Sequence, residues 1–384
     1  MKILLLGEYS NVHATLAKGL RKLGHQVTVV SDGDGWKNYQ RDIDLTRRSL
    51  SHTDTLLYYM RAWKTISKCK DYDVVQIINP MFLELQARRI KPFYKYLRRH
   101  NHRIVMCAFG MDHYWVKTCL DCTTFRYSDF NIGKHQRTEE TFNQQYIHDW
   151  LQGDKQQLNT YIAHDCDHII TGLCEYDMCY RPLFPTKTTY IPFPIEPQTA
   201  IQDQTTTQLQ AQPGSQLQEQ SGSQLQKPIR IFIGIQTTRS AYKGTDIMLR
   251  ALQRVKAKYP DRMEIVKVES VPFDVYKKQM QSADVIIDQL YSYTPAMNAL
   301  QAMSQGLVVV GGGEPENYAI IGETELRPII NVLPDEDDCY KKIEELVMHP
   351  EWLPRLKHES IEYIARHHDY VKVARQYEKV YESL

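Results

Sequence analysis

The chain has 384 residues, which is enough for two domains of ordinary size, each with its own core. Its 47 lysines and arginines balance 46 aspartates and glutamates, and the net charge of +1 excludes a global field that would recruit nucleic acid. No run reaches the roughly 18 apolar residues of a membrane span, and the segment before Gly7 is too short for a secretory signal, so we expect a cytoplasmic protein without nucleic-acid partners.

Eight cysteines are spread over the chain, without the density of a secreted disulfide scaffold. Cys119 and Cys122 have the spacing of half a zinc site. Because Cys166, Cys174 and Cys179 do not supply the second half cleanly, we expect reduced thiols and no metal site.

The first 30 residues have the pattern of a strand, a helix and a second strand. Residues 2–6 are an apolar run that ends in a loop at Gly7, Glu8 and Tyr9, and residues 26–30 form the second strand. This order predicts a Rossmann-like start. Gly7 alone is not the glycine fingerprint of a dinucleotide site, but its loop remains a good place for another ligand.

Residues 83–103 interleave basic residues with aromatic ones, and we predict that they form a surface helix. A basic, aromatic helix can lie on an anionic membrane leaflet, where each basic residue contributes about 1 kcal/mol. The alternative is a solvated helix face with no partner. On the first interpretation the protein would work at the inner face of the cytoplasmic membrane.

Two further features belong to the first half of the chain. Residues 103–108 are predicted to form a buried strand, which leads to a loop that carries Asp112. That carboxylate could either cap the next helix or face a ligand. Residues 114–151 are rich in aromatic and polar side chains, and we predict that they cross the mouth of a cleft.

Residues 197–227 differ abruptly from the rest of the chain in composition. They contain three copies of a glutamine-rich unit of eight residues that is poor in bulky apolar side chains. Such a unit cannot bury enough surface to offset the entropy of ordering, so we predict a disordered linker and not a solenoid.

Residues 229–316 repeat the alternation of strands and helices. A strand at 230–235 is followed by a polar loop and by Lys243-Gly244, where a helix begins. A buried strand at 284–288 precedes Thr294-Pro295, which is predicted to open a helix with a hydroxyl at its cap and proline at its first position. This helix would begin at the carboxyl edge of a parallel sheet, where open α/β folds bind anions. The alternative is an ordinary βαβ unit with no ligand.

The motifs after this helix resemble those of a known family. Gln301-Ala-Met-x-x-Gly306, the strand at 308–310 and Gly312-Gly-Glu-Pro-Glu316 are similar to the E-A-M-x-x-G, P-V-I and G-G-x-P-E signature of the retaining, bacterial-type GT-B glycosyltransferases of family 4 (group 1). The resemblance covers nearly all of the chain except 114–151 and 197–227. It implies an α/β protein of the GT-B fold, in which two Rossmann-like domains face each other across a cleft.

The resemblance also implies a domain division and a set of roles. Residues 1–196 would hold the acceptor, 197–227 would be the linker, and 228–384 would hold the donor and end in helices that cross back to the first domain. Lys243, with Arg239 as a second cation, would hold the donor diphosphate, and Asp112 would orient the acceptor hydroxyl, without a cofactor or a required metal. The expected donor-binding residues are Gly7, Gly234, Gly244, Val271, Pro272, Tyr293, Pro295, Ala296, Met297, Asn298 and Gln301, and those on the acceptor side are Glu8, Tyr9 and His13.

The implied reaction is transfer of a sugar, with retention, from a nucleotide-diphosphate sugar to a hydroxyl of a glycan or lipid-linked acceptor. Tyr293 and Gln301 stand where the family has two glutamates, and Phe109 stands where it has a histidine. Gln301 can still hydrogen-bond a ribose diol, without the strength of a charged acceptor. Two alternatives therefore remain open, a catalytically inactive nucleotide-binding GT-B protein and a nucleotide-sugar epimerase on the same fold.

Overall fold

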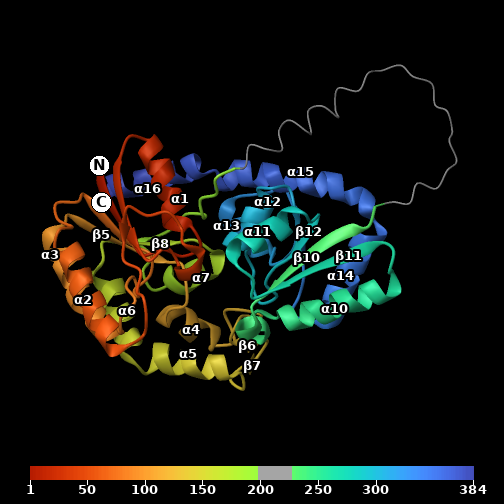
Figure 1. Ribbon diagram of the computed structural model, residues 1–384, viewed down its shortest axis with the longest axis horizontal. Coiled ribbons are helices and arrows are strands. Elements are labelled where there is room, and N and C mark those ends of the chain that lie inside the picture. The colour runs from red at the N-terminus through yellow and green to blue at the C-terminus, as the bar shows by residue number, and fades with distance from the viewer. Residues whose placement is uncertain (198–226) are drawn as a thin grey trace, which may run out of the picture.

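The computed structural model describes residues 1–197 and 227–384. The predicted linker, apart from its two end residues, lies outside them. Figure 1 shows two α/β domains side by side, each built around a parallel sheet with helices packed about it.

The sheet of the first domain has seven strands, all of them parallel. In sheet order they are β3 (Ile43–Asp44), β2 (Gln26–Ser31), β1 (Lys2–Leu6), β4 (Val74–Ile77), β5 (Arg103–Ala108), β8 (His168–Thr171) and β9 (Thr188–Tyr190). The central strands are buried on both faces, which is why they read as continuous apolar runs. The strand order reverses between β1 and β4, and a ligand crevice is expected at the carboxyl ends of the strands there.

The helices of the first domain connect these strands. They are α1 (Val12–Lys22), α2 (His52–Ile66), α3 (Ala87–His100), α4 (His113–Cys119), α5 (Thr141–Leu151), α6 (Asp154–Asp165) and α7 (Cys174–Tyr180). Between α4 and α5 lies a small antiparallel hairpin of β6 (Asn131–Ile132) and β7 (His135–Gln136). In Figure 1, α4, α5 and this hairpin lie along one edge of the molecule and reach the second domain.

The sheet of the second domain has five parallel strands. In sheet order they are β11 (Met263–Glu269), β10 (Ile229–Ile235), β12 (Val285–Ile287), β13 (Val308–Gly311) and β14 (Ile329–Asn331). Its helices are α9 (Ser240–Lys243), α10 (Thr245–Lys258), α11 (Phe273–Gln281), α12 (Met297–Met303), α13 (Pro315–Ile321) and α14 (Glu336–Met348). Here the strand order reverses between β10 and β12.

The last two helices return the chain to the first domain. α15 (Leu353–Tyr363) runs through one π-helical turn into α16 (Tyr370–Ser383), and α16 packs against α1. The two helices can approach closely because Gly19 has no side chain. A Cβ at this position would lie only 2.4 Å from the carbonyl oxygen of Tyr370. The Tyr381 hydroxyl donates a hydrogen bond to Gln76 Oε1 at 2.7 Å, which ties α16 to the first sheet.

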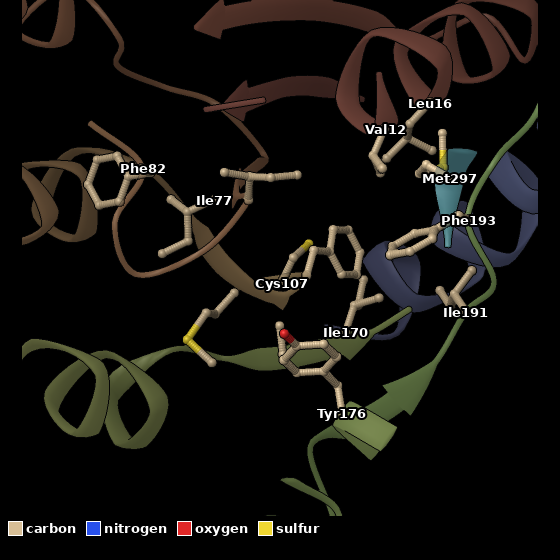
Figure 2. Packing of buried hydrophobic residues seen from close by; sticks show 14 of the residues in the cluster. Val12, Leu16, Ile77, Phe82, Cys107, Ile170, Tyr176, Ile191, Phe193 and Met297 are labelled. Atoms are coloured by element: carbon tan, nitrogen blue, oxygen red, sulfur yellow. The ribbon is translucent and has the colours of Figure 1, made fainter. Parts of the chain in front are cut away.

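Apolar packing continues across the boundary between the domains. Met297 of α12 belongs to the same buried cluster as Val12 and Leu16 of α1. Figure 2 shows these three side chains close to one another, above the core formed by β4, β5 and β8. The two domains therefore share a hydrophobic contact near the place where α1 begins.

The prediction for residues 83–103 needs a correction. The helix is shorter, Ala87–His100, and Phe93, Tyr94 and Leu97 are fully buried in the core. At helical spacing the aromatic and basic residues fall on opposite faces, so the outer surface of α3 is basic but not aromatic. Among the described residues, no helix is both long enough and apolar enough to cross a membrane.

Candidate functional site

A cavity of about 1070 Å³ lies between the two domains. The first domain contributes the loop after β1 and the loop after β2, and the second contributes α11 and α12. The residues that line it are Ser10, Asn11, residues 36–40, Glu196, Pro197, Pro272, Phe273, Asp274, Tyr276, Lys277, Met280, Gln281, Met297, Asn298, Gln301 and Gln305. Loops at the carboxyl ends of parallel strands are where open α/β sheets bind ligands.

Four of the predicted donor-binding residues line this cavity: Pro272, Met297, Asn298 and Gln301. The Gln301 side-chain amide donates to the Ser304 hydroxyl at 3.1 Å, which leaves its own oxygen available to accept from a ligand. Val271 instead packs against the core. Pro272 stands at the N-cap of α11, and the other three of these four residues belong to α12. The two segments follow β11 and β12, which flank β10 in the sheet.

The two predicted diphosphate cations lie beside the cavity and not on its surface. Lys243 is partly buried, and among the described residues its ammonium has no hydrogen-bond or ion-pair partner. Burial and the neighbouring charges of Arg239 and Lys37 lower its pKa, and the Asp288 carboxylate opposes them. The Nε atom of Arg239 is buried and makes no hydrogen bond to a described residue. Unmatched cations of this kind favour an anion between the domains.

A hydrogen-bonded chain runs from the cavity wall to Asp288, whose charge acts on Lys243. The Tyr276 hydroxyl donates to Asn298 Oδ1 at 2.9 Å, and the Asn298 amide donates to Asp288 Oδ1 at 3.1 Å. Burial raises the pKa of Asp288, and the Asn298 bond and the Lys243 charge oppose that rise. Gly234 makes room for this arrangement, since a Cβ there would lie 2.4 Å from the Tyr276 ring.

Gly244 shapes the turn that carries Lys243. Its φ of +71° is in the left-handed region, where a side chain is strained, and a Cβ would meet Leu290 at 2.6 Å. The glycine ends α9 and begins α10, so that Lys243 lies at the corner between the two helices.

The helix predicted to open at Thr294-Pro295 begins later, at Met297, with Ala296 at its N-cap. Thr294 does not cap it because its hydroxyl and its N–H both donate to the Glu175 carboxylate of α7. The N–H of Tyr293 donates to the same carboxylate at 2.7 Å. Pro295 and Ala296 therefore continue the loop, and Glu175 binds the N–H groups that precede the helix and not those of its first turn.

Tyr293, at the position of the family glutamate, is buried at the domain interface. Its hydroxyl accepts from the N–H of Arg126 at 2.7 Å. The Arg126 guanidinium forms ion pairs with Glu314 and Glu316, and the Tyr127 hydroxyl donates to Glu314 at 2.6 Å. The segment 114–151, which was predicted to cross the cleft mouth, thus fastens the first domain to the glycine loop of the second.

Two of the predicted acceptor-side residues, Glu8 and Tyr9, line a different, much smaller cavity, and so does Gly7, which was predicted to bind the donor. Gly7, Glu8 and Tyr9 surround about 20 Å³ together with residues of the loops after β2 and β4. The Glu8 carboxylate accepts from the N–H groups of His13 and Ala14, at 3.3 and 2.8 Å, and burial raises its pKa to about 8. Glu8 thereby satisfies donors of the first turn of α1.

His13 and Asp112 are fully buried, so neither can touch an acceptor from its present position. The His13 ring bonds to the carbonyl of Gly7 and to the Gln76 amide, and burial lowers its pKa to about 3. Asp112 caps α4 by accepting from the N–H of Trp115, and it also accepts from the Tyr180 hydroxyl. Burial raises the pKa of Asp112 to about 7. The structure thus corrects two predicted contacts, because both side chains hold the scaffold.

Three features of the site were not predicted. Trp36 and Lys37, in the loop after β2, line the cavity, and Glu175 joins α7 to the loop before α12. Trp36 and Lys37 follow the carboxyl end of a parallel strand, and this position could have been recognised from the sequence. Within the described ranges, no group of three or more His, Cys, Asp or Glu residues is arranged to hold a metal ion.

Comparison with known proteins identifies the fold. No family model and no curated protein sequence matches the chain. Among solved structures, HepE of Anabaena, in complex with UDP and glucose, is similar over 100% of both chains, with 13% identity and a TM-score of 0.58. A sucrose-phosphate synthase of Thermosynechococcus elongatus is similar over 100% of this chain and 99% of its own, with 14% identity and a TM-score of 0.61. The chain has the GT-B fold.

The GT-B fold with two Rossmann-like domains is therefore confirmed as predicted. Other structures with this likeness have a different stated activity. A UDP-GlcNAc 2-epimerase of Neisseria meningitidis, bound to UDP-GlcNAc, is similar over 100% of both chains, with 10% identity and a TM-score of 0.54. At these sequence identities the structural similarity shows the GT-B fold but not the reaction, which depends on the residues of the site.

Proposed function

We propose that this protein is a glycosyltransferase that moves a sugar from a nucleotide-diphosphate sugar to a hydroxyl acceptor, with retention at the anomeric carbon. One observation carries the proposal. In a GT-B fold, cations from both domains meet beside one large cavity, with Lys37 on its surface and Lys243 and Arg239 next to it without an ion pair to any described residue. A diphosphate is the anion that this arrangement would match best.

The chemistry proposed for these cations is stabilisation of the leaving group. Negative charge grows on the diphosphate as the glycosidic bond breaks, and fixed positive charges in a partly dry site stabilise it. A lysine with a lowered pKa gains a counter-charge when the diphosphate binds, so binding and protonation of Lys243 favour each other. Gln301 would contact the ribose diol, and no metal or cofactor is assigned a step.

The acceptor is proposed to be a glycan or a lipid-linked precursor that approaches the first domain. The outer face of α3 carries exposed basic residues, among them Arg88, Arg89 and Lys95. The neighbouring α2 exposes Leu56 and Leu57. Together they offer the basic and apolar side chains that bind an anionic membrane, which supports our proposal that the protein works at the inner face of the cytoplasmic membrane.

Incubation with a panel of UDP, GDP, ADP and dTDP sugars, with and without hydroxyl acceptors, tests the proposal. We expect release of the nucleoside diphosphate that depends on an acceptor, and an α-linked product from an α-linked donor. Isomerisation of the donor without any acceptor would instead support an epimerase, whose fold this chain shares. Thermal stabilisation by nucleotides without turnover would support an inactive binding protein, and either result would contradict the proposed reaction.

A further inference from the structure

The loop that follows β2 reaches from the first domain to the second. It contains one 3-10 turn, Gly35–Lys37. The Trp36 ring packs edge-on against Phe273 of α11, with ring centroids 5.5 Å apart, and Tyr39 packs against the same ring at 5.7 Å. Trp36 and Tyr39 also line the cavity, so this loop forms part of its wall from the opposite domain.

The loop has a defined conformation. Asp34 and Asn38 flank the turn with φ angles of 60° and 50°, in the left-handed region that these residue types tolerate. The N–H of Tyr39 donates to the carbonyl of Gly33 at 2.9 Å, which closes the loop on itself. A position held in this way can present a side chain at a fixed place.

Lys37 is the side chain that this conformation presents to the cavity. Its ammonium donates to Asp34 Oδ2 at 2.6 Å and to the Ser10 hydroxyl at 3.3 Å. The same Asp34 oxygen accepts from the N–H of Ser10 at 2.8 Å, so the loops after β1 and β2 are tied together beside Lys37. Ser10 lines the cavity as well. An ammonium has three donors, and the third remains available to a ligand.

The charge of Lys37 reaches the second domain. It is one of the charges that act on Lys243, together with Arg239. Lys37 and Lys277 are the only lysines or arginines among the described residues that line the cavity, and Lys277 instead lies over the Phe273 ring and pairs with Asp274. Of these two lysines on the cavity surface, Lys37 is thus the one whose charge acts on Lys243.

We propose that Lys37 binds the diphosphate of the donor from the first domain, opposite Lys243 and Arg239, so that the donor site is complete only when both domains contribute. This inference rests on the proposed function. It predicts that the site selects a nucleoside diphosphate over the parent nucleoside, because Lys37 would contact only the phosphates. The aromatic contacts of Trp36 and Tyr39 with Phe273 hold the loop where this contact can form.

Calorimetric titration with UDP, ADP, GDP and dTDP, and with the four parent nucleosides, tests the inference on the full-length protein. We expect Lys37→Ala and Lys37→Gln to weaken binding of the preferred diphosphate by about 10-fold to 100-fold, the range for losing a hydrogen bond to a charged group. Affinity for the parent nucleoside should stay unchanged, and Lys37→Arg should restore much of the loss. Lys277→Ala, which removes the same charge from the same cavity, should weaken diphosphate binding less than about threefold.

Two results would overturn the inference, and they are distinguishable. If the wild-type protein prefers a diphosphate over its nucleoside and both Lys37 variants keep that preference, Lys37 is not a ligand although the proposed function stands. If the wild-type protein binds no nucleotide at all, the proposed function fails and this inference fails with it. Melting curves of the Lys37 variants show whether they are folded, and the conservative Lys37→Arg variant supplies the comparison if Lys37→Ala is not.

Discussion

The interface between the two domains is filled on the side of the β6–β7 hairpin and hollow on the side of the loop after β2. On the filled side, Glu175 accepts from several donors of the second domain and Arg126 pairs with two carboxylates. On the hollow side, the side chains of Lys243 and Arg239 make no hydrogen bond or ion pair to a described residue, although the Asp288 carboxylate lies close enough to act on Lys243. Buried polar groups with a structural role form hydrogen bonds within the protein, whereas groups that bind a ligand often have no partner until the ligand is present.

From this contrast we infer that the filled side stabilises the interface and that the hollow side binds a ligand. Tyr293 stands where the family has a sugar-binding glutamate, yet it serves the filled side by accepting from the N–H of Arg126. In the function that we propose, the diphosphate binds on the hollow side. Variants on the filled side should therefore change stability, and variants on the hollow side should change binding and turnover.

The largest effect is expected for Glu175→Ala. It leaves the N–H groups of Tyr293 and Thr294 buried without an acceptor, and each such group costs about 1–3 kcal/mol, for a total of about 4 kcal/mol. Urea unfolding measures the loss. Glu139→Ala, on an exposed carboxylate of the same domain, is the matched control and should change stability by less than about 0.5 kcal/mol. Equal stability of the two variants would show that Glu175 does not stabilise the interface between the domains.

On the hollow side, Lys243→Ala is expected to lower kcat/KM for the preferred donor by about 100-fold or more, about 2.7 kcal/mol. The free energy of unfolding should not fall at neutral pH, because the burial that lowers the pKa of Lys243 makes its charge costly in the folded protein. Lys267→Ala is the control, since Lys267 pairs with Glu269 at 2.8 Å and has no assigned donor contact. Normal turnover by Lys243→Ala would refute the placement of the diphosphate.

A change of pH tests the buried network beneath the cavity. The pKa of His13 lies at about 3 when folded and at about 6.5 when unfolded, so its contribution is complete above pH 6.5 and is lost as the pH falls. We expect this contribution, measured as the difference in pH dependence between the wild-type protein and His13→Leu, to fall by about 2 kcal/mol between pH 7 and pH 5, at about 1.4 kcal/mol per unit of pH. The raised pKa values of Glu8 and Asp112 act in the opposite direction and are common to both proteins. His13→Leu should reduce this pH dependence, whereas His102→Leu, an exposed site, should keep it. An unchanged slope in His13→Leu would show that other groups govern acid unfolding.

The smallest effect is expected for Tyr127→Phe on the filled side. It removes one hydrogen bond to Glu314 and leaves the ring packing intact, at a cost of about 1.5 kcal/mol. Tyr146→Phe offers the comparison, since no described residue hydrogen-bonds the Tyr146 hydroxyl and its removal should be nearly neutral. A Tyr127→Phe variant as stable as Tyr146→Phe would mean that the Arg126 ion pair and the Asn331 amide, which donates to Glu314 Oε1 at 2.9 Å, satisfy Glu314 without Tyr127.

Much of the fold could be predicted because its signals are local. The strand at 2–6 and the strand at 229–235 are apolar runs bounded by turn residues, and their alternation with helices predicts parallel sheets. The α12 start could not be predicted. Thr294-Pro295 has the local chemistry of a helix start, but Glu175, 119 residues away, competes for the same hydroxyl and N–H.

A residue of the site could be predicted only where its position in the sequence, just after a strand, determined its position in the fold. Pro272, Met297, Asn298 and Gln301 line the cavity, since each follows a strand end of the second sheet. His13 and Asp112 also follow strand ends, but their side chains turn inward to satisfy nearby backbone groups. The sequence does not contain the direction of a side chain or the orientation of one domain against the other, and these decide which residues meet in the cavity.

The most direct test of the central claim is a crystal structure of the protein with the nucleoside diphosphate that it binds best. The account predicts that the diphosphate lies in the cavity between the domains, within hydrogen-bond distance of Lys243 or Arg239 from one side and of Lys37 from the other. It also predicts that Glu175 keeps its bonds to the loop before α12. A diphosphate bound away from these three cations, or one that displaces Glu175 to occupy the N–H groups of Tyr293 and Thr294, would contradict it.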